Sequence, residues 1–218
     1  MAPYPPPQQP APYFAPQPPP RPGGNRGLVI ALVTIAGVLA LVCLAGAAGV
    51  VWYLRNDKPA TSQDIAGVID YRATHPEWLK QDHRPPDEKI EYPMKPGAGG
   101  PHHQVWQQCK GDIYSSAIDE GNAVHSLEHG AVWITYQSGV TPAEVEKLAT
   151  KVRGNDYMLM SPFDGQASRI SLQAWGYQLA LSSVDDPRID AFILKYRQTA
   201  SMEPGVPCST GTTSTETS

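Results

Sequence analysis

Three side chains that can bind a metal or move a proton lie close together in the middle of the chain: His125, Glu128 and His129. They belong to the segment NAVHSLEHGAVWITY, residues 122–136, whose second half is apolar and has the composition of a β-strand. Imidazole nitrogens commonly bind zinc, copper, iron and nickel, and a carboxylate can join them or transfer a proton. The segment therefore predicts a polar site at the boundary of a buried core.

A metal site here depends on the local backbone. In a helical turn, His125 and His129 at positions i and i+4 share one face of the helix. In an extended chain they would lie about 13 Å apart, at about 3.3 Å per residue, and no single ion could bridge them. The metal hypothesis therefore requires a helix or tight turn at 125–129, and Gly130 is a suitable residue to end it.

Further ligands must come from another part of the chain. A Gly-Pro turn at 100–101 precedes His102 and His103 and could bring one of them to the site, and Cys109 is a further alternative. We predict a binding module for a transition metal, zinc or copper, with these ligands: His102, His125, Glu128 and His129. The alternative without metal is a structural or accessory subunit of an envelope complex, in which these groups form a buried hydrogen-bond network.

The pattern His125-x-x-Glu128-His129 also matches the H-x-x-E-H motif of inverted zinc peptidases, whose glutamate activates zinc-bound water. Glu203 could then act as a third ligand. Those enzymes place the motif within a long helix, whereas here Gly130 and a β-branched run follow at once. A zinc-dependent hydrolase is therefore the less favoured alternative, and the sequence assigns no catalytic residue.

Two of the three cysteines, Cys109 and Cys208, lie outside the apolar N-terminal segment. Such a pair suits a disulfide bond formed in an oxidising compartment. Thiolate ligation of copper or zinc is the main alternative, and a redox-active pair is disfavoured because there is no C-x-x-C motif. A Cys109–Cys208 bond would attach the C-terminal region to the histidine segment.

Capping signals and periodicity after residue 136 predict the elements that hold this segment. Thr141, Pro142 and Glu144 have the types and spacing of a helix N-terminus with a capping box, and Gly154 ends that helix. Asp186-Pro187 begins a second helix in the same way. Apolar runs and alternation predict strands between the two helices, at 157–160, 169–175 and 177–181.

The region before the histidines is less regular. A short helix is expected between Ser62 and Lys80, with an interruption at His75-Pro76, because a residue before proline avoids the helical conformation. The next segment is rich in Pro and Gly, but it includes apolar side chains that are costly to expose: Ile90, Tyr92, Met94 and Trp106. We therefore expect an irregular but packed segment. The predicted fold class is α+β, a single small domain with a mixed or antiparallel sheet and two main helices.

Residues 27–54 carry no charged side chain. They exceed the roughly 20 residues that cross a bilayer, and Trp52 and Tyr53 at their end are typical of a membrane interface. The apolar run is longer than that of a signal peptide and follows a long tail, so we predict one uncleaved transmembrane helix. The flanking positive charges are nearly balanced, but the cysteine pair favours a cytoplasmic N-terminus and an extracytoplasmic domain.

These predictions divide the chain into five segments. Residues 1–26 are a disordered Pro-rich tail, 27–54 the transmembrane helix, 55–74 a linker with a short helix, 75–208 the extracytoplasmic domain, and 209–218 a disordered Ser/Thr-rich tail. The net charge is −4 and the basic residues are scattered, which argues against binding to nucleic acid. The predicted partners are the membrane and another envelope protein.

Several motifs occur in a fixed order: GGPHH (99–103), Trp106, Cys109, VHSLEHGAVWITY (124–136), MSPF (160–163), QAWG (173–176) and EPGVPC (203–208). On these motifs the chain resembles the domain-of-unknown-function 3105 family of bacterial membrane-anchored proteins, over roughly residues 75–208. The resemblance implies a similar extracytoplasmic domain and no established reaction. One departure is visible, because family members tend to have glycine directly after the cysteine, whereas here Lys110 precedes Gly111.

Overall fold

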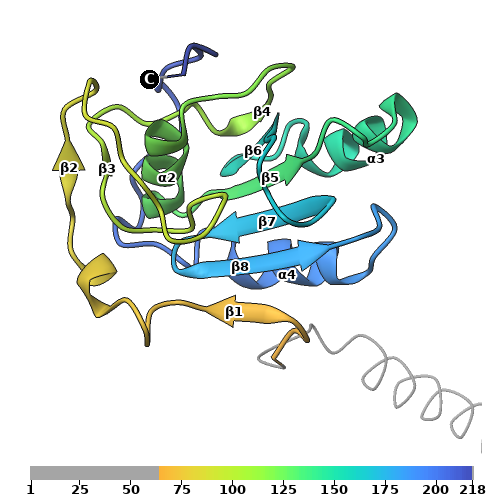
Figure 1. Cartoon of the computed structure of the whole chain (residues 1–218), viewed down its shortest axis with the longest axis horizontal. Coiled ribbons are helices and arrows are strands. Elements are labelled where there is room, and N and C mark those ends of the chain that lie inside the picture. Colours follow the sequence, from red (N-terminus) through yellow and green to blue (C-terminus); the bar gives the residue numbers. More distant parts are fainter. Residues whose placement is uncertain (1–63, 218) are drawn as a thin grey trace, which may run out of the picture. The chain divides into compact units, whose positions relative to one another are not determined.

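A computed structural model of the chain describes residues 64–217 (Figure 1). The predicted Pro-rich tail and transmembrane helix, residues 1–26 and 27–54, lie outside this range. Between residues 64 and 217, no helix combines the length and the apolar character needed to cross a membrane. The described residues fold as α+β with a mixed sheet, as the sequence predicts.

The main sheet has six strands in the order β1-β8-β7-β5-β6-β4. Strand β5 lies inside the sheet, where it pairs parallel with β6 and antiparallel with β7. All five residues of β5 are buried, which explains the continuous apolar run VWITY. The strands are Val68–Asp70 (β1), Lys110–Ile113 (β4), Val132–Tyr136 (β5), Met158–Pro162 (β6), Ile170–Ala174 (β7) and Tyr177–Leu181 (β8).

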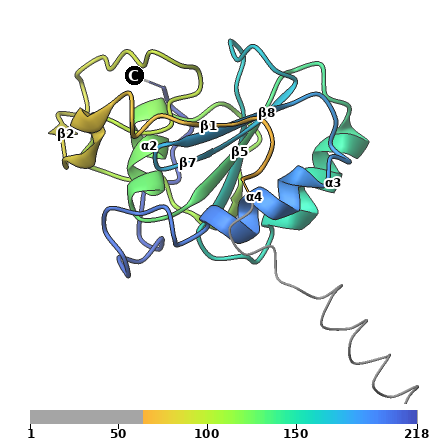
Figure 2. The same ribbon diagram turned by 90° about the horizontal axis from the view of Figure 1, so that it is seen from below.

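Helices α3 (Pro142–Val152) and α4 (Arg188–Tyr196) lie side by side on one face of this sheet (Figure 2). Their inner faces contribute Leu148, Val152 and Phe192 to the core. An ion pair between Lys151 and Asp190 connects the two helices. These two helices and the strands between them are the elements that capping residues and periodicity predict, and that prediction is confirmed.

The capping box at the start of α3 is confirmed in detail. The Thr141 hydroxyl accepts from the Glu144 amide, and the Glu144 carboxylate accepts from the Thr141 amide. Arg169 adds two charge-assisted hydrogen bonds of 2.7 Å to the same carboxylate. The hydrogen bonds from Arg169, followed by those from Thr141, lower the pKa of Glu144 to about 2.

This lowered pKa predicts a pH-dependent stability. The contribution of the Glu144 carboxylate is fully present above its ordinary pKa of 4.5 and is lost as the pH falls toward about 2. Glu144→Gln should therefore lower the melting temperature at pH 7, and its difference from the wild type should shrink between pH 4.5 and 2. Thermal melts followed by circular dichroism check this, with the exposed Glu216→Gln as control. A difference that stays constant over this range would contradict the prediction.

The described residues contain one α-helix more than the two that the sequence predicts. Helix α2 (Glu120–Glu128) lies at one end of the main sheet, beside strands β2 and β3, which are described below (Figures 1 and 2). Asp119 is its N-cap and accepts from the Asn122 amide. Seven of its nine residues are buried, so α2 presents no amphipathic stripe that periodicity could detect.

Two further expectations are wrong within the described residues. The short helix expected between Ser62 and Lys80 is replaced by strand β1 and by a 3-10 helix, Pro76–Leu79 (η1), because Val68–Asp70 pairs with β8. The tail after Cys208 is paired instead of disordered. Thr212 forms a parallel bridge with Gln107, and its amide donates to the Trp106 carbonyl.

The Pro- and Gly-rich segment is irregular but packed, as predicted. Tyr92 is buried, Ile90 and Met94 pack against the core, and residues 96–100 are buried. The segment contains only a two-stranded parallel sheet, His83–Arg84 (β2) with His102–His103 (β3). This pairing sets His83 opposite His102.

Candidate metal centre

Helix α2 provides the geometry that a metal site at 125–129 requires. His125 and Glu128 lie in its last turn, and His129 is its C-cap. Gly130 follows with φ of 102° and ends the helix, as predicted. A side chain there would also lie 3.0 Å from the Gln198 Cα, so the tight turn into β5 requires glycine.

Four side chains form a group that we call the inner cluster: His83, His102, His125 and Glu128. Each offers one ligand atom, and these atoms all lie within 4.8 Å of one another. Glu128 Oε2 is 2.9 Å from His102 Nε2 and 3.6 Å from His83 Nε2. Ligands of a tetrahedral ion with bonds near 2 Å lie about 3.3 Å apart, so the inner cluster is close to a coordination shell.

The two buried imidazoles of the inner cluster are oriented by backbone carbonyls. His102 Nδ1 lies 2.8 Å from the Gly100 oxygen, and His125 Nδ1 lies 2.7 Å from the His103 oxygen. Because a carbonyl can only accept, each Nδ1 must carry the proton and donate it. In the neutral ring this leaves the lone pair of Nε2 for a metal, and hydrogen bonds of this kind commonly hold metal-binding histidines in place.

Burial favours the neutral, metal-binding form of the α2 histidines. Desolvation, followed by repulsion from the imidazole of His102, lowers the pKa of His125 to about 3. Burial likewise lowers the pKa of His129, although the nearby Glu128 carboxylate opposes the shift. Both groups are therefore ready to bind a cation at neutral pH without first releasing a proton.

Glu128 is the residue that most clearly indicates a site for a cation. Its side chain is completely buried, and neither carboxylate oxygen accepts a hydrogen bond from the described residues. The 2.9 Å contact with His102 Nε2 is poorly aligned, and that nitrogen also has no hydrogen-bond partner there. A buried carboxylate without donors is costly, and a metal ion would compensate its charge. The residues present therefore fit a metal.

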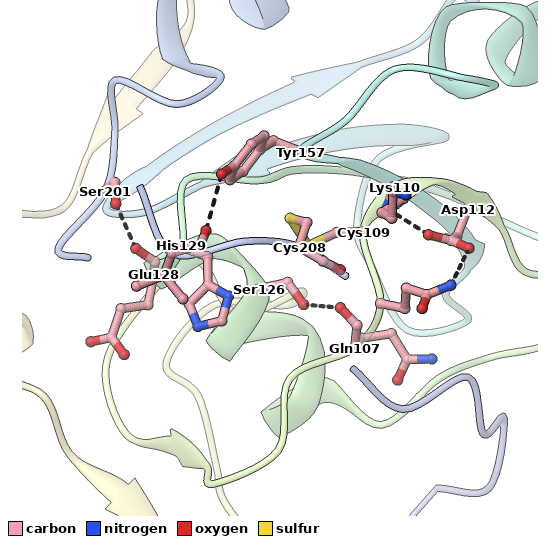
Figure 3. The surroundings of a disulfide bond; sticks show 12 residues. Gln107, Cys109, Lys110, Asp112, Ser126, Glu128, His129, Tyr157, Ser201 and Cys208 are labelled. Carbon is pink, nitrogen blue, oxygen red and sulfur yellow. Dashed lines mark hydrogen bonds between the residues drawn. A yellow bond between two sulfur atoms is a disulfide. The ribbon is translucent and has the colours of Figure 1, made fainter. Parts of the chain in front are cut away.

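A second group, the outer cluster, consists of His125, His129 and Glu203, whose ligand atoms also lie within 4.8 Å of one another. His129 Nε2 is 3.4 Å from Glu203 Oε2. The segment that carries Glu203 is held against the end of α2. Figure 3 shows the hydrogen bond that the Ser201 hydroxyl donates to the Glu128 carbonyl. The amides of Met202 and Glu203 donate to the same oxygen.

The disulfide bond between Cys109 and Cys208 is confirmed and holds the same C-terminal segment (Figure 3). It joins residues 99 positions apart and brings their Cα atoms to 4.9 Å. Both sulfurs are in the bond, so the alternative in which Cys109 is a thiolate ligand does not apply. The Tyr157 hydroxyl donates to the Val206 carbonyl and fixes the segment a second time.

Tryptophan rings border both clusters. The ring of Trp175 lies 5.6 Å from that of His102, and the ring of Trp106 lies 4.9 Å from that of His129. An apolar border restricts water and strengthens the electrostatic attraction of a bound ion. These indoles also make metal binding accessible to fluorescence measurements.

The structure brings together all four of the ligands predicted from sequence, but in two overlapping groups. His102, His125 and Glu128 belong to the inner cluster, whereas His129 belongs to the outer cluster. The alternative ligand His103 does not contribute. Its Nδ1 lies 2.8 Å from Asp119 Oδ1, and its Nε2 lies 3.1 Å from the Glu88 carbonyl oxygen.

Sequence reasoning missed His83, because it stands alone in a Pro-rich segment and no spacing connects it to the other histidines. The only signal was that the chain has six histidines and that five of them lie between residues 83 and 129. Glu203 was considered only as a ligand in the hydrolase alternative. Both residues reach the site through tertiary contacts.

The fold and the site define a small α+β domain with a buried histidine–carboxylate centre. The model of the family described as "protein of unknown function (DUF3105)" matches residues 83–210, more than half of the chain, and the protein belongs to this family. The matched region begins at His83 and includes every residue of both clusters. No curated protein and no solved structure matches the chain.

Proposed function

We propose that this protein is a membrane-anchored, extracytoplasmic module that binds one transition-metal ion, zinc or copper, through the inner cluster. The observation that carries this proposal is the buried Glu128 carboxylate, which accepts no hydrogen bond from residues 64–217 and lies beside the Nε2 atoms of His102 and His83. Three imidazoles and one carboxylate suit a divalent first-row metal, for which an N/O site favours copper over zinc in affinity.

The anchor and the location are part of the same proposal. The uncharged segment 27–54 supports a single transmembrane helix with a cytoplasmic N-terminus. The Cys109–Cys208 bond supports an oxidising compartment for the folded domain. The exposed side chain of His83, 36% accessible, gives the inner cluster contact with solvent.

The zinc-hydrolase alternative gains one observation, since Glu203 does lie beside His129. In that alternative His125, His129 and Glu203 hold the zinc ion and Glu128 activates water. Glu128 Oε2 instead lies 2.9 Å from His102 Nε2, where it completes the inner cluster. Loss of metal in a His102 variant favours the binding module, and loss only in a His129 variant favours the hydrolase.

Metal binding by the full chain in detergent tests the proposal. We expect one Zn²⁺ or Cu²⁺ per chain, and His102→Ala or His125→Ala should weaken binding by more than about 100-fold, since loss of a second-shell contact alone costs about 10–100-fold. Elemental analysis and isothermal titration measure this, and circular dichroism checks that the variants fold.

His75→Ala is the matched control, because His75 lies outside both clusters and stacks on Trp78. It should bind metal like the wild type. A wild-type protein that stays metal-free in micromolar Zn²⁺ and Cu²⁺ would instead favour the accessory-subunit alternative, in which the clusters are a structural network.

A further inference from the structure

The inner and outer clusters share one residue, His125. Its Nδ1 donates to the His103 carbonyl, so only Nε2 has a lone pair for a metal. One lone pair binds one ion. The two clusters therefore cannot each hold a fully coordinated ion at the same time, and they are alternative positions for a single ion.

The two positions differ in their ligands and in their contact with solvent. The inner cluster has four ligands, including the completely buried His102 and Glu128. The outer cluster has three, and its carboxylate belongs to Glu203, whose side chain is 21% accessible. An ion should therefore bind more tightly in the inner cluster and reach the outer one more easily.

The outer cluster is also built so that Glu203 stays in place without an ion. Its amide donates to the Glu128 carbonyl, and its Oε1 accepts a hydrogen bond from Gln81. Gln81 is two residues before His83, so this contact joins the C-terminal segment to the strand that carries an inner ligand. The Glu128 and Glu203 carboxylates thus belong to different clusters that share His125.

We propose that the outer cluster is a transfer position, in which His129 and Glu203 capture the ion with His125 and pass it to Glu128, His102 and His83. This inference rests on the proposed function. During transfer His125 stays bound while the two outer ligands are replaced by the inner ones. No covalent bond in the protein changes.

A transfer position has a kinetic signature that an ordinary ligand lacks. It lies on the path in both directions, so its loss slows binding and release alike and leaves the equilibrium affinity unchanged. Loss of an ordinary ligand speeds release instead. Loss of a merely attractive surface charge slows binding and does not slow release.

Glu203→Gln is the variant that tests this, because glutamine keeps the shape and can still accept from Gln81. Stopped-flow mixing of the full chain with Cu²⁺ measures the binding rate through quenching of Trp106 and Trp175 fluorescence, and mixing of the loaded protein with a chelator measures release. We expect both rates to fall at least 10-fold, with the dissociation constant changed less than twofold. His129→Asn should behave in the same way, and the exposed Glu91→Gln is the charge-matched control.

Each other outcome is decisive. Unchanged rates in Glu203→Gln would overturn the transfer position and indicate that the ion reaches the inner cluster directly past His83. Faster release would overturn it and make Glu203 an ordinary ligand. Two Cu²⁺ ions per wild-type chain would also overturn it, since the positions would then fill together. A wild-type chain that binds no Cu²⁺ overturns the proposed function itself.

Discussion

Replacing both cysteines of the disulfide, Cys109→Ser with Cys208→Ser, is expected to lower the free energy of unfolding by about 2–5 kcal/mol, the usual range for a native disulfide. The bond closes a loop between residues 99 positions apart, and an open chain gains the corresponding conformational entropy when it unfolds. Urea unfolding followed by tryptophan fluorescence measures the loss.

The remaining contacts of the C-terminal segment should keep it in place in the folded double variant. Ser201, Met202 and Glu203 still hydrogen-bond to the Glu128 carbonyl. All four inner ligands come from residues outside the segment, so the folded variant should keep its metal affinity. Cys43→Ser is the control and should leave the unfolding curve unchanged. Equal unfolding midpoints for the double variant and the wild type without reductant would contradict the prediction.

The elements that sequence predicts correctly are those with local signals. Thr141, Pro142 and Glu144 define the start of α3 without reference to the rest of the chain, and alternation identifies β7 and β8. Hydrogen bonds within the helix end and side chains on one sheet face produce such patterns directly. Elements with such local signals can therefore be predicted from the sequence alone.

Helix α2 could not be predicted in this way, because its stability comes from distant contacts. It has nine residues, and Gly121, Asn122 and the site residues His125 and Glu128 interrupt any apolar stripe. Its last turn is held by distant segments, because the Ser126 hydroxyl donates to the Gln107 carbonyl and the Ser201 hydroxyl donates to the Glu128 carbonyl. A short helix is marginal without such tertiary packing.

The same distinction applies to the site. His125, Glu128 and His129 were found because they are adjacent in sequence and share one helical turn. His83 reaches the inner cluster through the parallel pairing of β2 with β3, and Glu203 reaches the outer cluster through the disulfide-linked segment. Pairings between distant segments leave no spacing rule in a single sequence, so the complete ligand set required the structure.

Glu128→Met is expected to be at least as stable as the wild type without metal and less stable than the wild type with metal. Without metal, the wild type holds a buried carboxylate that has no hydrogen-bond donor among the described residues. Replacing such a charge with an apolar side chain of similar volume typically leaves stability unchanged or raises it by about 1–4 kcal/mol. In the presence of a chelator, the variant should therefore be at least as stable as the wild type.

With metal the order should invert. An ion at about 100 to 1,000 times its dissociation constant stabilises the wild type by about 2.7–4.1 kcal/mol. The variant lacks one ligand and should gain little. Urea unfolding of both proteins with saturating Zn²⁺ and with chelator measures all four free energies.

Glu120→Gln separates this effect from a general effect of losing a carboxylate on α2. Glu120 accepts a 2.6 Å hydrogen bond from the Gly97 amide and belongs to neither cluster. Its substitution should therefore change stability by the same amount with and without metal. If Glu128→Met is instead destabilised under both conditions by a similar amount, protein donors must satisfy the Glu128 carboxylate. The clusters would then be a hydrogen-bond network. Only if Glu128 binds a cation should Glu128→Met change the free energy of unfolding in opposite directions with and without metal.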